Sequence, residues 1–285
     1  MRLLVTGAGG QLGHDLVRVA AAAGDDVVGA DHATLDVTDR DAVLGAITTW
    51  RPDAVVHGAA WTAVDACEDD PERAFATNAV AVRWVAEGCH RVGAHLVHVS
   101  TDYVFDGTLD RPYHEWDRPN PRSVYGASKL AGEGEALALG PDAAVVRTSW
   151  LCGAAGSNVV EKVLGAAGRL ERPDRLAFVD DQRGCPTFTA DLAPVLRRLA
   201  VDRRSGMLHV TNQGVVSWYE FAREILAAAG HDPDLVRPIS TAELDPPRPA
   251  PRPANSALDN AVLRAAGLPL LRDFREPLAE LIATS

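Results

Sequence analysis

Residues 2–13 read RLLVTGAGGQLG, an apolar run followed by a turn with three glycines spaced three residues apart. The run predicts a buried strand at Arg2–Val5, and the residues after the turn predict a helix over Gln11–Ala23. Glycines at such a turn permit tight bending, close approach of the backbone to a pyrophosphate, and close packing of helix on strand. We therefore predict that the chain opens with a dinucleotide-binding turn. Its glycines are Gly7, Gly10 and Gly13.

The alternation of strand and helix continues through the first half of the chain. Further strands are predicted at Val27–Ala30, Ala54–His57, Leu96–Ser100 and Ala144–Thr148, with a short additional strand before Leu35. Helices are predicted over Arg40–Trp50 (N-capped by Thr38-Asp39), Pro71–Val92 and Tyr125–Leu139. This order indicates an α/β fold, a Rossmann-type doubly wound parallel sheet whose ligands bind at the carboxyl ends of the strands.

The pattern loosens after Trp150, which predicts a dinucleotide-binding domain at 1–150 and a smaller, mainly substrate-binding C-terminal lobe at 151–285. Within that lobe, residues 159–180 and 207–230 are expected to return to the first domain. The later predicted elements are strands at Leu176–Val179 and Met207–Val210 and helices at Trp218–Ala229 and Leu258–Ala266. Residues 245–253 contain five prolines in nine positions, which excludes a helix interior or a central strand. They predict an extended connection across the lobe, with a disordered linker as the alternative.

Composition excludes several classes of protein. The chain has 285 residues, 47% of them hydrophobic, and a net charge of −11, which argues against a nucleic-acid or anionic-membrane partner. No apolar run is long enough for a membrane span, and a first strand that begins at residue 2 leaves no room for a signal peptide. The four cysteines are far apart, so we expect a cytoplasmic protein with reduced thiols.

Several residues after strand ends are candidates to bind a dinucleotide. Asp31 ends the second strand, where a carboxylate can accept hydrogen bonds from a ribose hydroxyl; this favours NAD over NADP, unless Asp31 is only a solvated turn residue. Asp36 is placed to reach the adenine amino group, and Val37 to pack on its ring. The small residues Gly58-Ala59-Ala60 would let the backbone run beside the cofactor.

Tyr125 and Lys129 lie four residues apart and therefore share one face of the predicted helix. A neighbouring ammonium stabilises a phenolate, so we expect Lys129 to lower the pKa of Tyr125 from its usual value near 10. Tyr125 would then act as a general acid toward a carbonyl oxygen, and Thr101, at its strand end, would hold that oxygen. A Tyr-x-x-x-Lys match alone is common, but here it follows a glycine turn and a strand-end threonine in the expected order.

These residues resemble the extended short-chain dehydrogenase/reductase family and, more narrowly, the dTDP-4-dehydrorhamnose reductase family. The resemblance runs nearly end to end. It rests on TGAGGQLG at 6–13, AAWTAVD at 59–65, STDYVFDG at 100–107, YGASKLAGE at 125–133, RTSW at 147–150, DQRGCPT at 181–187 and RPANS at 252–256.

The resemblance implies reduction of the C4 ketone of dTDP-4-dehydro-L-rhamnose to dTDP-L-rhamnose with NADPH or NADH. The implied catalytic residues are Thr101, Tyr125 and Lys129, and the implied substrate-binding residues are Thr101, Asp102 and Trp150. The predicted cofactor-binding residues are Gly7, Gly10, Gln11, Leu12, Gly13, Asp31, Asp36, Val37, Ala59, Ala60, Trp61, Thr62, Tyr125 and Lys129. Trp150 can also be interpreted as a core tryptophan where the two lobes meet.

Magnesium occurs in some relatives, and Asp15 matches one of their acidic residues. No acid is placed cleanly within 187–191, however, so no metal is predicted here. The expected partner is a sugar nucleotide, with a homodimer left open.

Three alternative functions belong to the same fold. A dehydratase of this superfamily would follow the strand-end threonine with an Asp-Glu pair, whereas Thr101 is followed by Asp102-Tyr103. A 4-ketoreductase for another dTDP-deoxysugar fits the same motifs, because specificity depends on pocket shape. A non-catalytic regulatory subunit of the same fold is the third alternative, since a fold does not guarantee an activity.

Overall fold

The computed structural model describes residues 1–140, 142–169 and 175–284. Its centre is a six-stranded parallel sheet in the order β2-β1-β3-β4-β5-β10. The strands are β1 (Arg2–Thr6), β2 (Asp26–Ala30), β3 (Ala54–His57), β4 (His95–Thr101), β5 (Ala144–Thr148) and β10 (Gly206–His209). Strand order reverses at β1, which lies between β2 and β3. This is the doubly wound sheet that the sequence predicts, and its switch point marks where a ligand is expected.

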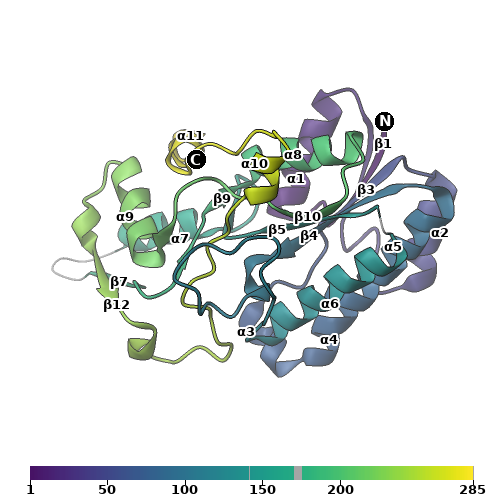
Figure 1. Cartoon of the computed structure of the whole chain (residues 1–285). Coiled ribbons are helices and arrows are strands. Elements are labelled where there is room, and N and C mark those ends of the chain that lie inside the picture. Colours follow the sequence, from purple (N-terminus) through teal and green to yellow (C-terminus); the bar gives the residue numbers. More distant parts are fainter. Residues whose placement is uncertain (141, 170–174, 285) are drawn as a thin grey trace.

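Helices cover both faces of the sheet, as Figure 1 shows. One face packs against α1 (Gln11–Ala22) and α8 (Thr189–Val201), which also contact each other. The other face packs against α2 (Arg40–Trp50), α5 (Ala81–Val92) and α6 (Val124–Leu139). The central strands β3, β4 and β5 are buried along their whole length, which is why they read as continuous apolar runs.

The predicted helix Pro71–Val92 is a continuous helical segment with an irregular centre. It consists of α4 (Pro71–Phe75), a π-helical turn η1 (Ala76–Val80) and α5. It is preceded by α3 (Val64–Asp69). A π turn widens the helix and often lies next to a functional site. This π turn contains Asn78, whose side chain is fully buried.

Two local predictions are wrong. No strand precedes Leu35: residues 31–39 form turns in which the side chains of Asp31 and Asp36 accept hydrogen bonds from Thr34 and Thr38. Such side-chain bonds compete with strand pairing. The predicted helix Leu258–Ala266 is shortened to α10 (Ala261–Ala265), because Leu258 pairs with Tyr113 in an isolated bridge.

The second lobe lies to one side of the sheet, at the left of Figure 1. It contains α7 (Val159–Ala167), α9 (Trp218–Ala228) and α11 (Arg275–Thr284) around an apolar cluster. Its short strands form three pairs: β7 (Leu176–Val179) with β12 (Val236–Ile239), β8 (Arg183–Gly184) with β11 (Val216–Ser217), and β6 (Leu151–Cys152) with β9 (Thr187–Phe188). The second lobe also has short 3-10 turns at Pro233–Leu235 and Thr241–Glu243, and a third such turn, Asp102–Val104, follows β4 in the first domain.

The expected return of residues 159–180 to the first domain is wrong for the strand that it contains. β7 pairs with β12 rather than with the six-stranded sheet, and α9 packs on β7 and β12. Residues 170–174 of that segment lie outside the described residues. Of the segment 207–230, which was also expected to return, β10 joins the sheet beside β5, whereas α9 lies in the second lobe. Helix α8, which was not predicted, covers β3 and β4. The chain therefore crosses between the lobes several times.

The proline-rich segment has neither helix nor strand and runs back to the first domain. Arg252 pairs there with Asp65 of α3 through its two terminal guanidinium nitrogens, Nη1 and Nη2. The backbone nitrogen of Ala250 also donates to that carboxylate at 3.2 Å. This supports an extended connection rather than a disordered linker. Among the described residues, no helix is both long enough and apolar enough to cross a bilayer.

Candidate active site

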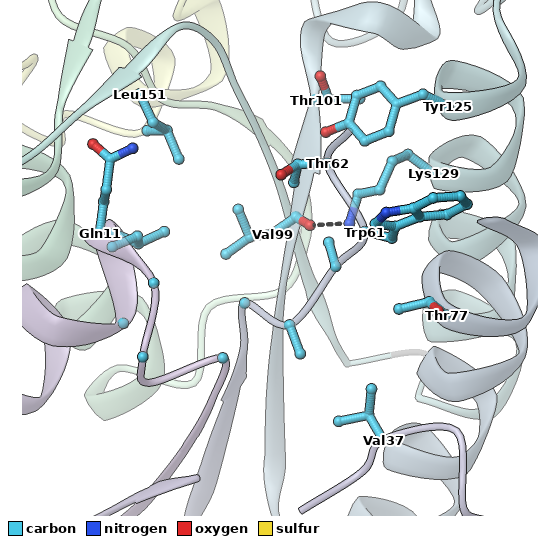
Figure 2. Close-up of a pocket in the computed structure, with 18 of the residues that line it drawn as sticks. Gln11, Val37, Trp61, Thr62, Thr77, Val99, Thr101, Tyr125, Lys129 and Leu151 are labelled. Carbon is cyan, nitrogen blue, oxygen red and sulfur yellow. Dashed lines mark hydrogen bonds between the residues drawn. The ribbon is translucent and has the colours of Figure 1, made fainter. Parts of the chain in front are cut away.

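A cleft of about 1380 Å³ opens at the carboxyl ends of the sheet strands. Every residue predicted to bind cofactor or substrate lines it. Figure 2 shows the arrangement: Gln11 and Leu151 lie on one side, and Thr101, Tyr125 and Lys129 lie on the other. The position agrees with the rule that open parallel sheets bind ligands at a switch point.

The glycine turn provides a cradle that side chains would fill. Gly7 has φ +75°, and a Cβ there would lie 2.7 Å from the backbone nitrogen of Ala59. A Cβ on Gly13 would lie 2.2 Å from the carbonyl oxygen of Gly7. Helix α1 begins at Gln11 without a side-chain cap, so the free N–H groups of its first turn border the cleft. This geometry suits a pyrophosphate.

The far end of the cleft is formed by the turns after β2. Asp31 Oδ1 accepts hydrogen bonds from the backbone nitrogen (2.9 Å) and hydroxyl (2.8 Å) of Thr34, and these bonds hold the pKa of Asp31 below its usual value. Asp36 Oδ1 accepts the equivalent pair from Thr38 at 2.9 and 2.8 Å. Both carboxylates therefore line the cleft as fixed, ionised parts of turns rather than as free side chains.

The backbone after β3 forms the floor of the cleft. Trp61 N donates to Asn78 Oδ1 at 2.8 Å, and Asn78 Nδ2 donates to the Trp61 carbonyl at 3.1 Å and to Ser128 Oγ at 3.0 Å. One buried amide thus joins this loop to α6. Sequence reasoning missed Asn78, although an asparagine inside a predicted helix is itself a signal, since it is a poor residue for a helix interior.

Thr101, Tyr125 and Lys129 come together as the sequence predicts. Thr101 ends β4, while Ser123 caps α6 by accepting a hydrogen bond from Gly126 N at 3.1 Å, which places Tyr125 in the first turn. The capped turn sits so close to the preceding loop that a Cβ on Gly126 would lie 2.2 Å from the Tyr103 carbonyl. Figure 2 shows the hydroxyls of Thr101 and Tyr125 side by side.

The expected lowering of the Tyr125 pKa by Lys129 is wrong. Burial raises the pKa of Tyr125 above its usual value, and a hydrogen bond with Thr101 opposes the rise only in part. Lys129 Nζ donates to the Val99 carbonyl at 2.7 Å, and burial lowers the pKa of Lys129 to about 8, with Glu133 opposing. Burial disfavours the charged form of Tyr125 more than Thr101 favours it, and it disfavours the charged form of Lys129 more than Glu133 favours it. Tyr125 is therefore protonated at neutral pH, the state that a proton donor requires.

Asp102 is a buried carboxyl that accepts a hydrogen bond from Thr101 Oγ1 at 3.0 Å. Burial raises its pKa to about 7, although hydrogen bonds from Ser256 and Thr101 oppose this. A carboxyl that titrates near neutrality beside the reactive hydroxyls is typical of functional sites.

Asp102 should make folding stability depend on pH. Its folded pKa of about 7 lies above the ~3.9 of an unfolded aspartate, so its proton stabilises the folded state at low pH. That stability is lost as pH rises through the interval from about 4 to 7. The Asp102→Asn variant cannot titrate, so its free energy of unfolding relative to wild type should increase between pH 4.5 and 8. Urea unfolding at both pH values measures this, with the exposed Asp69→Asn as the control. A difference that stays constant with pH would contradict the assignment.

Trp150 lies just past β5 and lines the cleft. Its φ is +46°, a left-handed backbone that a tryptophan rarely adopts. It is half-buried and packs against the apolar cluster of the second lobe, so the alternative of a tryptophan where the two lobes meet is correct in part. Sequence reasoning missed other residues of the cleft, among them Arg73, Thr77, Val99, Leu151, Ser157 and Trp218. They come from segments with no motif, and chain topology alone brings them to the cleft.

Gln11 joins the two lobes across the cleft. Its Oε1 accepts from Gly153 N at 2.7 Å, and its Nε2 donates to the Ser157 carbonyl at 3.3 Å. Asp15 accepts from Thr189 Oγ1 and pairs with Arg18. Among the residues that the structure describes, no group of three or more His, Cys, Asp or Glu side chains is arranged to hold a metal ion.

A family model described as the RmlD substrate binding domain matches residues 1–285. A dTDP-4-dehydrorhamnose reductase from Streptomyces griseus is 45% identical over 98% of this chain and 92% of its own length. A probable dTDP-4,6-dihydroxy-2-methyloxan-3-one 4-ketoreductase from Streptomyces antibioticus is also 45% identical, over 98% and 94%.

Solved structures agree in shape as well as in sequence. A dTDP-4-dehydrorhamnose reductase from Bacillus anthracis, in complex with NADP, superimposes with a TM-score of 0.93 at 35% identity, covering 100% of this chain and 99% of that one. The Clostridium acetobutylicum enzyme of the same name gives a TM-score of 0.94 at 39% identity, over 100% and 99%.

Proposed function

The chain belongs to the RmlD substrate binding domain family, and from that premise we propose that it reduces the C4 ketone of dTDP-4-dehydro-L-rhamnose to dTDP-L-rhamnose with NADPH or NADH. The observation that carries the proposal is the convergence of Thr101, Tyr125 and Lys129 on a cleft that begins at a glycine cradle. The similar proteins named above supply the substrate, because the cleft alone does not identify a sugar.

The residues present fit the implied cofactor. Gly7 and Gly13 leave room that any side chain would occupy, and the first turn of α1 offers free N–H donors to phosphate oxygens. Lys129 is charged below about pH 8 and is placed to hold the ribose hydroxyls on the nicotinamide side. The nicotinamide, when bound, supplies the hydride.

The side chains of the chain perform the remaining chemistry. Thr101 and Tyr125 would both hydrogen-bond the ketone oxygen, since their hydroxyls lie together at the strand end. Tyr125, which is protonated at neutral pH, then donates its proton to the oxygen as negative charge develops there. The Thr101 hydroxyl donates to Asp102 Oδ1 in this structure, so its single proton would have to turn from that carboxyl to the ketone oxygen when the substrate binds. Trp150 lies where an aromatic ring can pack on a sugar.

A second candidate is a 4-ketoreductase for a different dTDP-deoxysugar. The Streptomyces antibioticus ketoreductase matches as well as the rhamnose enzymes do, at 45% identity over nearly the whole chain. Both candidates use the same catalytic residues and differ in the sugar pocket. The regulatory-subunit alternative is less favoured, because Thr101, Tyr125 and Lys129 are all present in the cleft.

The deciding experiment supplies purified protein with dTDP-4-dehydro-L-rhamnose and each nicotinamide in turn, and follows oxidation at 340 nm. Product mass and stereochemistry then identify the sugar. Turnover of this substrate at least about tenfold better than of other dTDP-keto sugars supports the rhamnose assignment. Preference for another keto sugar supports the second candidate, and no oxidation with any of them overturns the enzymatic proposal.

The choice of nicotinamide should depend on Asp31. Its carboxylate is ionised and would repel a 2′-phosphate, whereas Asn would keep the hydrogen bonds to Thr34 without the charge. Asp31→Asn is therefore expected to raise the NADPH/NADH ratio of kcat/KM by about tenfold. Steady-state kinetics with both cofactors measure this. An unchanged ratio would place the 2′ position away from Asp31.

The proposed compartment is the cytoplasm. The cysteines Cys67, Cys89, Cys152 and Cys185 are all buried free thiols, which is usual in a reducing compartment. A homodimer stays a prediction.

A further inference from the structure

Trp150 is held in place by contacts on two sides. Its indole stacks on that of Trp218, with ring centroids 3.6 Å apart and an angle of 9° between the planes. On another side it meets Gly184 of β8, where a Cβ would lie 2.5 Å from Cε2 of the indole and 2.7 Å from Nε1. Only glycine leaves room for the ring in this position. The left-handed backbone of Trp150 carries the indole to this place.

Gly184 and Trp218 belong to one small structure. Gly184 pairs with Val216 across β8 and β11, and Trp218 is the first residue of α9, directly after β11. Ser217 caps α9 by a capping box in which its Oγ accepts from Glu220 N at 3.0 Å and its own N donates to Glu220 Oε2 at 2.7 Å. The start of α9 is therefore fixed, and with it the ring of Trp218.

Trp150 and Trp218 also form part of the cleft surface. Both line it, although they come from segments about 70 residues apart, and both are half-buried rather than fully enclosed. Trp218 belongs to the second lobe, so the stacked pair brings one residue of each lobe together at the cleft surface. A flat aromatic surface of this kind suits the apolar face of a sugar or a pyrimidine base.

We propose that Trp218 is a positioning residue for the sugar nucleotide: its stacked ring, together with Gly184, holds the Trp150 indole as the wall against which the substrate binds. The inference rests on the proposed function for the identity of the ligand. It adds to that function the residues that place Trp150, which no motif in the sequence signals. A purely structural role would predict lost stability without a selective loss of substrate affinity.

The test compares wild type with Trp218→Leu, Trp218→Phe, Trp150→Leu and the double variant Trp150→Leu/Trp218→Leu. Isothermal titration measures Kd for dTDP-L-rhamnose and for NADPH. Trp218→Leu should raise the Kd for dTDP-L-rhamnose about tenfold and leave that for NADPH within about twofold, while Trp218→Phe, which keeps a stacking ring, should cost only about threefold. Because Trp218 acts through Trp150, the double variant should bind no more weakly than Trp150→Leu alone.

Two further measurements separate position from stability. Stacked indoles couple in their absorption, so Trp218→Phe should remove a near-ultraviolet circular dichroism signal that the matched control Trp116→Leu, at an exposed tryptophan, retains. Gly184→Ala keeps both indoles but forces Trp150 away, and it should lower dTDP-L-rhamnose affinity to the same extent as Trp218→Leu. It also provides the test if Trp218→Leu does not fold.

Several results would overturn the inference: wild-type affinity in Gly184→Ala or Trp218→Leu, an equal loss for NADPH, or additive losses in the double variant. The proposed function fails separately. If wild-type protein binds dTDP-L-rhamnose but reduces no keto sugar, the proposed reaction is wrong, and the role of Trp218 can still be tested by binding. If wild-type protein reduces the keto sugar but Trp218→Leu binds dTDP-L-rhamnose as tightly as wild type, the proposed reaction stands and the role of Trp218 is wrong. Wild type that binds no dTDP-sugar overturns both.

Discussion

The Tyr125→Phe protein should reduce its keto-sugar substrate about 10²–10⁴-fold more slowly in kcat than wild type, the range expected for loss of a positioned general acid. Phenylalanine removes only the hydroxyl and keeps the ring packed edge-on against that of Tyr103; the centroids of the Tyr103 and Tyr125 rings are 5.8 Å apart. Burial keeps the Tyr125 phenol protonated, and this phenol is the group to which the proposed mechanism assigns the proton transfer. Steady-state kinetics at saturating substrate measure the effect.

A matched control separates chemistry from folding. Tyr113 is a buried tyrosine outside the cleft, and its hydroxyl donates to Asp106 Oδ1 at 2.9 Å. Tyr113→Phe should lower stability without a comparable fall in kcat. The Kd of Tyr125→Phe for NADPH should stay within about threefold of wild type, because the hydroxyl is one contact among many. Equal kcat values for wild type and Tyr125→Phe would remove Tyr125 from the proposed mechanism.

Loss of one partner of the buried Glu133–Arg147 pair should lower the free energy of unfolding by about 3–5 kcal/mol, the range for an uncompensated buried charge. The two side chains are 4% and 3% exposed, and Arg147 donates to both carboxylate oxygens, at 2.8 and 2.7 Å. Ser100 Oγ donates to the same carboxylate at 2.6 Å. Arg147→Met would leave the buried Glu133 carboxyl with the neutral Ser100 hydroxyl as its donor. Urea unfolding of the single variant measures the loss.

The chain offers an internal comparison for this pair. Glu135, two residues further along α6, pairs with Arg83 at 2.9 Å, but the two side chains are 32% and 49% exposed. Glu135→Gln should cost no more than about 1 kcal/mol, because water screens an exposed pair. The double variant Glu133→Leu/Arg147→Met should recover most of the loss, since it removes both charges. A single-variant cost as small as that of Glu135→Gln would show that water reaches the buried pair.

Local signals predicted most of the first domain. The glycine turn, the Asp39 cap of α2 and the apolar strands β3, β4 and β5 each depend on neighbouring residues, and each lies within a residue or two of its predicted bounds. The placement of Thr101, Tyr125 and Lys129 followed because parallel strands end at the same edge of a sheet. The strand order reverses at β1, and this switch point leaves a cleft at the carboxyl ends of the strands.

The features that were missed depend on distant contacts. β7 reads as a sheet strand, but its partner β12 lies about 60 residues later, and no local pattern reveals the pairing. Trp218 reads as an ordinary apolar residue of an amphipathic helix until Trp150 is placed on it. The pKa of Tyr125 was misjudged because the sequence shows the neighbouring ammonium and does not show the burial, which acts more strongly.

The crossing of α8 and β10 back into the sheet has a consequence for how the protein can be divided. A fragment that stopped at residue 150 would leave β5 as an unpaired edge and strip α8 from the apolar face made by β1, β3 and β4. Such a piece would aggregate rather than bind a nucleotide by itself. The two lobes therefore depend on each other for folding, so neither can be moved to another scaffold by cutting at the boundary that the sequence suggests.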